Sequence, residues 1–249
     1  MQPQSERPTA RRIQTRVVDL VERVLNSRKL GLIKREWLDT WRLPVAPAGP
    51  VKTVVGVDPS DSGAGDACGL IAASLSAEGV IALLADVSEP LTSEQWARRA
   101  VELAISTGAS EISIESFAAG TTYRAVVEDA IKRMRPGRSI RVTAWPPPKS
   151  GRGRGDAEAR SAGLRQALEV GRCRVAGHLP AFEAQAVAWQ SGQHQPDSLA
   201  AATVAFDVLD HSIGQGMTVI NPLEIARRNR ERGHQPPAWM TRTVGGGRR

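Results

Sequence analysis

The chain of 249 residues has only two cysteines and no long apolar run, and each absence excludes a class of protein. Cys68 and Cys173 both fall in expected strands, which indicates buried free thiols in a reducing compartment and not a disulfide framework. No apolar run approaches the about 18 residues that cross a bilayer, and no apolar stretch follows the charged N-terminus as in a secretory signal. We therefore expect a soluble, cytoplasmic protein.

Several catalytic signatures are also missing. The chain contains no GxxxxGK(S/T), which argues against a P-loop ATPase, and no GxSxG, HExxH or paired CxxC. Positive charge is in excess, because 33 Lys and Arg residues stand against 26 Asp and Glu residues, for a net charge of +7. This excess favours a polyanionic partner, although charge alone leaves DNA, RNA and acidic membranes open.

The sequence divides into three parts. Residues 1–50 contain one helical pattern, followed by LGLIKREWLDTW and the proline cluster PVAPAGP, which indicates a linker into the main domain. Residues 51–213 carry enough apolar positions for one sizeable core. Residues 214–249 are rich in Arg, Gly and Pro, and we expect a basic, partly disordered tail there.

The central part predicts an α/β domain. Three strands come first and are joined by short connections, which is typical of a meander, and helices then alternate with strands. Thr92 and Gln95 form a capping-box signature, and Gly108 suits the left-handed end of the helix that they start. The expected strands are 51–57, 67–75, 80–86, 111–115 and 140–145, and the expected helices are 92–107 and 121–134, with two or three more after them. This order predicts a mixed sheet with helices on its faces.

Three acids stand where expected elements end or begin. Asp58 and Glu115 each close an apolar strand, and Asp197 opens an alanine-rich helix. A carboxylate at the end of a buried strand is costly unless a charged group pairs with it, and a divalent cation held by several carboxylates is a common solution. Two ions about 3.5 to 4 Å apart, held by such acids, support phosphoryl transfer. We therefore expect a metal site for phosphate chemistry.

Each acid also has a structural interpretation. Asp58 precedes Pro59 and fits a turn, and Asp197 follows Pro196 and fits a helix cap, whereas Glu115 lies in an otherwise apolar strand. Asp66 and His194 are weaker candidates for places around the metals, and both fit a solvated loop. Asp207 and Asp210 lie too far along the last helix to share the face of Asp197, and we leave them out.

Basic residues supply candidate DNA contacts. The loop PPPKSGRGRGD follows the strand next to the acidic edge, and its Lys149, Arg152 and Arg154 are placed to track phosphates or simply to lie in solvent. The tail carries further arginines that suit DNA or a protein partner, namely Arg227, Arg228, Arg230 and Arg232.

The order of these motifs resembles the nuclease domain of the phage terminase large subunit, a ribonuclease H-like domain of the DNA-packaging motor. The resemblance runs from about Gly31 to Leu209 and rests on LGLIKREWLDTW, VVGVDPSDSGAGDACGLIAA, ISIESFAAGTTYRAVVEDAI, ALEVGRCRV, FEAQAVAWQSG and QPDSLAAATVAF. It implies that Asp58, Glu115 and Asp197 are catalytic acids that bind Mg²⁺ or Mn²⁺ in a two-metal site. It further implies an endonuclease that cuts viral DNA concatemers during packaging, with low sequence specificity, in the host cytoplasm.

The resemblance also implies partners and shows two departures. Double-stranded DNA, the portal and the small terminase are the implied partners. Many relatives have a second acid three residues after the position of Asp197, where this chain has Ala200. The ATPase half of the family is not in this sequence, so we expect a separate nuclease subunit or an excised domain.

Three other functions remain open. A junction-resolving or transposase-like nuclease would use the same fold on branched DNA or transposon ends. A packaging scaffold would keep the acids and bind DNA without cutting it. An actin-like sugar kinase, suggested by VGVDPSDSG, ranks last because 249 residues are too few for both lobes.

Overall fold

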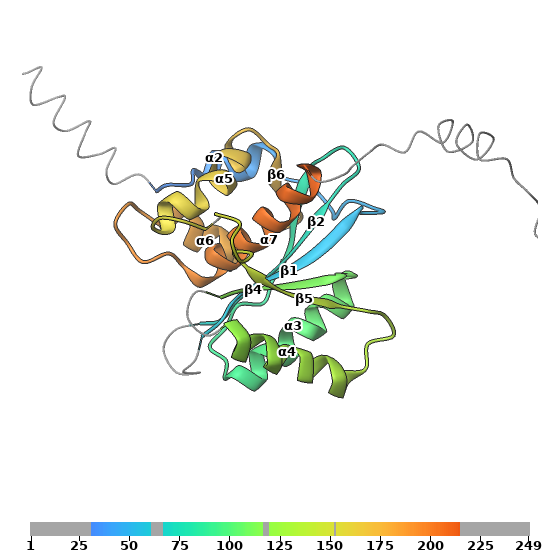
Figure 1. Cartoon of the computed structure of the whole chain (residues 1–249). Helices are drawn as coiled ribbons and strands as arrows, with labels where there is room; N and C mark the ends of the chain where they lie inside the picture. Colours follow the sequence, from blue (N-terminus) through green and yellow to red (C-terminus); the bar gives the residue numbers. More distant parts are fainter. Residues whose placement is uncertain (1–30, 61–66, 117–119, 152, 215–249) are drawn as a thin grey trace, which may run out of the picture. The chain divides into compact units, whose positions relative to one another are not determined.

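One of the two central strands of the sheet is β1 (Lys52–Asp58), whose middle five residues are all buried. The computed structural model describes residues 31–60, 67–116, 120–151 and 153–214. It contains a six-stranded sheet in the order β5-β4-β1-β2-β3-β6 (Figure 1). A strand covered on both faces must be apolar throughout, which explains why TVVGV shows no polar alternation.

The first three strands form the expected meander. β2 (Gly69–Leu75) pairs antiparallel with β1, and β3 (Ile81–Asp86) pairs antiparallel with β2. Gly79 turns the chain between β2 and β3 with φ +81°, a conformation that glycine adopts without strain. These pairings confirm the antiparallel part of the mixed sheet that the sequence predicts.

The other three strands are parallel to their neighbours. β4 (Glu111–Glu115) pairs with β1, β5 (Arg141–Trp145) pairs with β4, and the short β6 (Cys173–Val175) pairs with β3. In the register of β1 and β4, Val57 stands opposite Ile114. The next residues along the two strands, Asp58 and Glu115, therefore end at the same edge of the sheet.

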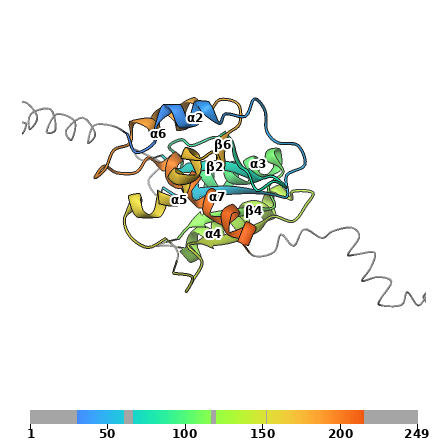
Figure 2. The ribbon, with the colours of Figure 1, turned by 90° about the horizontal axis from the view of Figure 1, so that it is seen from above.

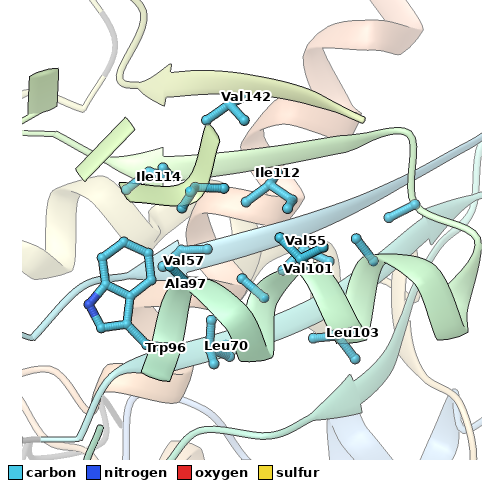
Figure 3. Packing of buried hydrophobic residues seen from close by; sticks show 14 of the residues in the cluster. Val55, Val57, Leu70, Trp96, Ala97, Val101, Leu103, Ile112, Ile114 and Val142 are labelled. Atoms are coloured by element: carbon cyan, nitrogen blue, oxygen red, sulfur yellow. The ribbon is translucent and has the colours of Figure 1, made fainter. Parts of the chain in front are cut away.

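One face of the sheet is covered by α3 (Ser93–Thr107) and α4 (Gly120–Met134) (Figure 1). The capping box of Thr92 and Gln95 is present, and Gly108 ends α3 with φ 76°, so both expected helix signals are confirmed. Figure 3 shows Trp96, Ala97 and Val101 of α3 packed against apolar side chains of the sheet. This layer forms one continuous part of the core.

The opposite face carries α5 (Ala157–Glu169), α6 (Pro180–Ala188) and α7 (Asp197–Gly214). α7 comes unusually close to the sheet, because a Cβ on Gly56 would lie 2.2 Å from the carbonyl oxygen of Ala201. Contacts that tight require glycine on the strand. Helices on both faces complete the expected architecture.

The last part of the expected N-terminal segment packs onto this domain. α2 (Arg35–Thr40) lies against α5 and α6 (Figure 2), and its Leu38 is buried, as is Ile33 just before it. Leu43 extends the sheet edge beyond β6 by pairing with Ala176. The domain boundary near residue 50 stays a prediction, and residues 31–43 share the core of the sheet domain.

Both cysteines are buried free thiols, as expected. Cys173 begins β6, whereas Cys68 lies one residue before β2 and makes an isolated bridge to Glu89. Burial raises the pKa of both thiols above the ordinary value. Within the described residues, no helix combines the length and the apolar character that a membrane span requires.

Candidate metal centre

Asp58 and Glu115 lie side by side at the end of two adjacent parallel strands. Their carboxyl groups share a hydrogen bond, and the side chain of Glu115 is only 13% exposed. The position follows from the register, since parallel neighbours end at the same edge and their last side chains meet there. Two acids that are far apart in the sequence thus form one close pair.

Ionisation of Asp58 is unfavourable beside Glu115, because the group is partly buried and lies next to other acids. Burial, the hydrogen bond with Glu115, and the charges of Glu115 and Asp197 raise the pKa of Asp58 well above its usual range. The positive charge of Arg160 opposes the rise. Without a further cation Asp58 therefore keeps a proton, which it shares with Glu115 through their hydrogen bond.

Asp197 approaches from the opposite layer as the first residue of α7. The glycine at the start of β2 sets its depth, because a Cβ on Gly69 would lie 2.0 Å from the carbonyl oxygen of Asp197. The first turn is closed by the N–H groups of Leu199 and Ala200, which donate to the carbonyl oxygen of Pro196. Asp197 is near enough for its charge to act on Asp58.

Arg160 is a site residue that the sequence analysis did not identify. It lies on the first turns of α5, and its guanidinium is 3.9 Å from Oε1 of Glu115. Its side chain is 23% exposed, so the charge is only partly screened by water. Asp156, which caps α5 by accepting the N–H of Ala159, is the local signal that places Arg160 just inside the helix.

The remaining candidates are more scattered. His194 is exposed in the loop before α7, and Lys149 and Arg154 are exposed in the loop after β5. Asp66 and Arg152 lie outside the described residues, as do the tail arginines. Their assigned roles stay predictions.

The two acids left out of the site lie elsewhere on α7. Asp207 accepts a hydrogen bond from the indole N–H of Trp145. Asp210 forms an ion pair with Arg172 at 3.0 Å. Ala200 stands at the position where a second acid was expected in many relatives, and this residue is buried (7% exposed). The interpretation of α7 as a helix with one acid at the candidate centre agrees with these positions.

The donor set suits a hard divalent cation. Carboxylate oxygens are the ligands that Mg²⁺ and Mn²⁺ prefer, and a cation at Asp58 and Glu115 would replace their shared proton. In the part of the chain that the structure describes, no three Asp, Glu, His or Cys side chains stand close enough to hold a metal. The close pair would therefore be the primary ligands, and Asp197, whose charge acts on Asp58, is the candidate third ligand.

Three antiparallel strands followed by three strands that pair parallel with their neighbours, with acids ending β1 and β4 and a third opening α7, define a ribonuclease H-like domain. Residues 55–206 match the family model described as the terminase RNaseH-like domain. The chain therefore belongs to this family. The resemblance found in the sequence is confirmed.

Solved structures agree on the fold. The nuclease domain of the large terminase subunit gp2 of bacterial virus Sf6 has 15% sequence identity and a TM-score of 0.51, over 73% of this chain and 98% of that one. A mutant of the Sf6 domain, solved with manganese and β-thujaplicinol, has 16% identity and a TM-score of 0.50, over 70% and 97% of the two chains. A mutant solved with calcium has 15% identity and a TM-score of 0.50, over 73% and 99%. No curated protein sequence matches the chain.

Proposed function

We propose that this protein is a divalent-metal-dependent DNA endonuclease that cuts viral DNA concatemers during genome packaging. The observation that carries the proposal is the pair formed by Asp58 and Glu115, two carboxyl groups that meet at one sheet edge and suit a shared cation. Family membership supports a nuclease of the terminase type. Manganese and calcium in structures of the Sf6 domain support a divalent cation.

The three acids would have distinct tasks. Asp58 and Glu115 would hold the divalent ions together, and Asp197, whose charge acts on Asp58, would add a third carboxylate. When bound, the ions supply an activated water and stabilise the leaving oxygen of the phosphodiester. Asp58 and Glu115 are only partly exposed, so their carboxyl groups are held in place at the end of the two strands.

Arg160 would supply positive charge beside the reacting phosphate. Its guanidinium lies at the edge of the acid pair, where it faces Glu115 and remains partly open to solvent. A phosphoryl transition state gains negative charge on its oxygens, and a preorganised cation stabilises that charge more than the ground state. The geometry therefore suits Arg160 to contact a non-bridging oxygen.

Double-stranded DNA would reach the site across the basic loop after β5. Lys149 and Arg154 are exposed there, and Arg152 lies between them in the sequence. A separate or excised ATPase motor subunit, the portal and the small terminase would be the protein partners, in the cytoplasm of the host. These assignments rest on family membership and on the net charge of +7.

A plasmid assay tests the function. Purified protein should nick and linearise supercoiled DNA with Mn²⁺ or Mg²⁺ and should lose this activity in EDTA. Asp58→Ala and Glu115→Ala should each remove activity while circular dichroism remains unchanged, and Asp210→Ala, which alters a surface ion pair, is the matched control. Full activity in EDTA would overturn the proposal.

The same assay separates the alternatives. A junction-resolving or transposase-like enzyme would cut branched DNA in preference to linear DNA of the same sequence. A packaging scaffold would bind DNA tightly and would not cut it, whichever divalent ion is present. Cleavage of linear and branched DNA at similar rates supports the terminase-type nuclease.

A further inference from the structure

The segment that precedes the nuclease domain is anchored on α6. We call residues 31–43 the connector. Its Leu32 N–H donates to the carbonyl oxygen of Trp189 at 2.8 Å, just past the end of α6. A Cβ on Gly31 would lie 1.9 Å from the carbonyl oxygen of Val187, so the two backbones touch. The connector therefore contacts the C-terminal end of α6 directly.

A buried ion pair anchors the other end of α6. Glu183, with a side chain 6% exposed, accepts from Arg42 at 2.8 Å and from Arg35 at 2.6 Å. It also accepts the N–H of Leu179 at 3.0 Å and so caps the first turn of α6. Because buried carboxylates need partners, Glu183 ties the connector firmly to the helix.

The opposite side of α6 contacts the helix that carries the third acid. The hydroxyl of Ser198 donates to Oε1 of Gln185 at 2.7 Å, and Ser198 is 1% exposed. Ser198 directly follows Asp197 in the first turn of α7. The bond to Gln185 therefore links the first turn of α7 to α6, and the close approach at Gly69 links the same turn to β2.

We propose that Arg42 and Glu183 are positioning residues that act through α6 and Ser198 to hold the Asp197 carboxylate at the Asp58–Glu115 pair. The connector, α6 and α7 form one continuous series of contacts that includes two partly buried polar bonds. The inference rests on the proposed function in one respect, that Asp197 binds metal. It adds that metal binding depends on the contact between the connector and α6.

A double-mutant cycle tests this coupling. Mn²⁺ affinity is measured by calorimetry for the full chain, Arg42→Ala, Asp197→Ala and the double variant. Arg42→Ala should weaken binding about tenfold, the size typical for groups that orient metal ligands. In the Asp197→Ala background Arg42→Ala should have no further effect, because the residue through which it acts is gone. Equal effects in both backgrounds would overturn the proposal.

Hydrogen exchange on the metal-free protein provides a readout that needs no metal. Arg42→Ala should speed exchange of the Leu199 and Ala200 amides, which close the first turn of α7. Arg172→Ala, which removes an exposed ion pair with Asp210, is the control and should leave these amides unchanged. Unchanged exchange in Arg42→Ala would contradict the proposal even if metal affinity falls.

Gln185→Ala is a second variant that interrupts the same series of contacts, and it replaces Arg42→Ala if that variant does not fold. Gln185 is exposed, so its loss should spare the fold while removing the bond to Ser198. The expected results are faster exchange of the first turn of α7 and weaker Mn²⁺ binding. Failure of the wild type to bind Mn²⁺ would refute the metal-dependent function, whereas the exchange result alone decides the positioning.

Discussion

At the scale of single residues, the candidate site is a place where negative charge is concentrated at a cost. Asp58 and Glu115 are in contact and partly buried, and both effects raise the pKa of Asp58. Proteins commonly accept such instability at sites where function requires it. Asp58 and Glu115 should therefore lower the stability of the metal-free protein and raise the stability of the metal-bound protein.

Asp58→Asn should stabilise the metal-free protein while abolishing cleavage. The asparagine amide can donate to Glu115 with no charge to bury, so we expect a gain of more than about 1 kcal/mol, since one pKa unit is worth about 1.4 kcal/mol. Thermal unfolding should show a higher Tm for the variant in EDTA and a Mn²⁺-induced rise in the wild type alone. Asp129→Asn, at an exposed pair with Lys132, is the control.

The pH dependence of metal-free stability follows from the direction of that shift. The folded pKa of Asp58 lies above the unfolded value of about 3.9, so its contribution is fully present below about pH 4 and is lost as pH rises. The stability advantage of Asp58→Asn should therefore grow between about pH 4 and about pH 8. Denaturant titrations at several pH values check this, and a constant difference would contradict the shared proton.

At the scale of elements, the site depends on how closely α7 sits on the sheet. Gly56 and Gly69 leave room for the helix backbone, and Gly69 faces the residue that carries the third carboxylate. Glu183 joins the start of α6 to Arg42. Its pKa is lowered to about 2, mainly by hydrogen bonding to Arg42. Two substitutions probe these contacts separately.

Gly69→Ala should displace Asp197 and lower cleavage by about 100-fold or more, because a misplacement of about 1 Å at a catalytic group has that effect. The added Cβ would lie 2.0 Å from a backbone oxygen, so the first turn of α7 must move. Plasmid cleavage and circular dichroism are the measurements. Gly137→Ala, where a Cβ meets nothing within 4 Å, should be silent.

Glu183→Gln should destabilise the protein at neutral pH by about 3 kcal/mol, since it leaves Arg42 and Arg35 without their buried partner. A depressed folded pKa contributes stability above the ordinary carboxyl pKa and loses it as pH falls toward about 2. The difference between variant and wild type, measured by denaturant titration, should therefore shrink from about pH 7 to about pH 3. Glu102→Gln, at an exposed pair, should cost little at either pH.

At the scale of the whole molecule, net charge and the placement of basic side chains govern encounter with DNA. The chain carries +7, and the exposed Lys149 and Arg154 follow β5, the strand next to the one that ends in Glu115. Charge spread over a surface gives affinity and salt dependence without sequence preference. Low sequence specificity is thus the expected behaviour of this surface.

Lys149→Ala combined with Arg154→Ala should weaken DNA binding at all sequences alike. The slope of log K against log salt should fall by about 2, close to one for each lost phosphate contact. Fluorescence anisotropy with catalytically inactive Asp58→Ala protein measures the slope. Arg98→Ala, which removes an arginine paired with Glu102 on α3, should leave the slope unchanged.

The order of elements and the existence of an acidic centre were readable from the sequence. Apolar runs that end in Asp58 and Glu115 predict two buried strands, and Thr92, Gln95 and Gly108 predict both ends of α3. These are local signals, since capping and burial patterns depend on a few neighbouring residues. The family resemblance then depends on their order along the chain.

Only the tertiary structure decided which groups meet. The contact of Asp58 with Glu115 depends on the register in which β1 pairs with β4, and a one-residue slip would send one side chain to the other face. The Asp156 cap locates Arg160 at the start of α5, but only the packing of α5 brings its guanidinium to Glu115. The connector's contact with α6 likewise joins residues far apart in sequence, as in the pair of Arg42 and Glu183. The sequence alone determined strand ends, caps and charge, because these depend on neighbouring residues, and long-range packing determined the acid pair, its neighbours and its support.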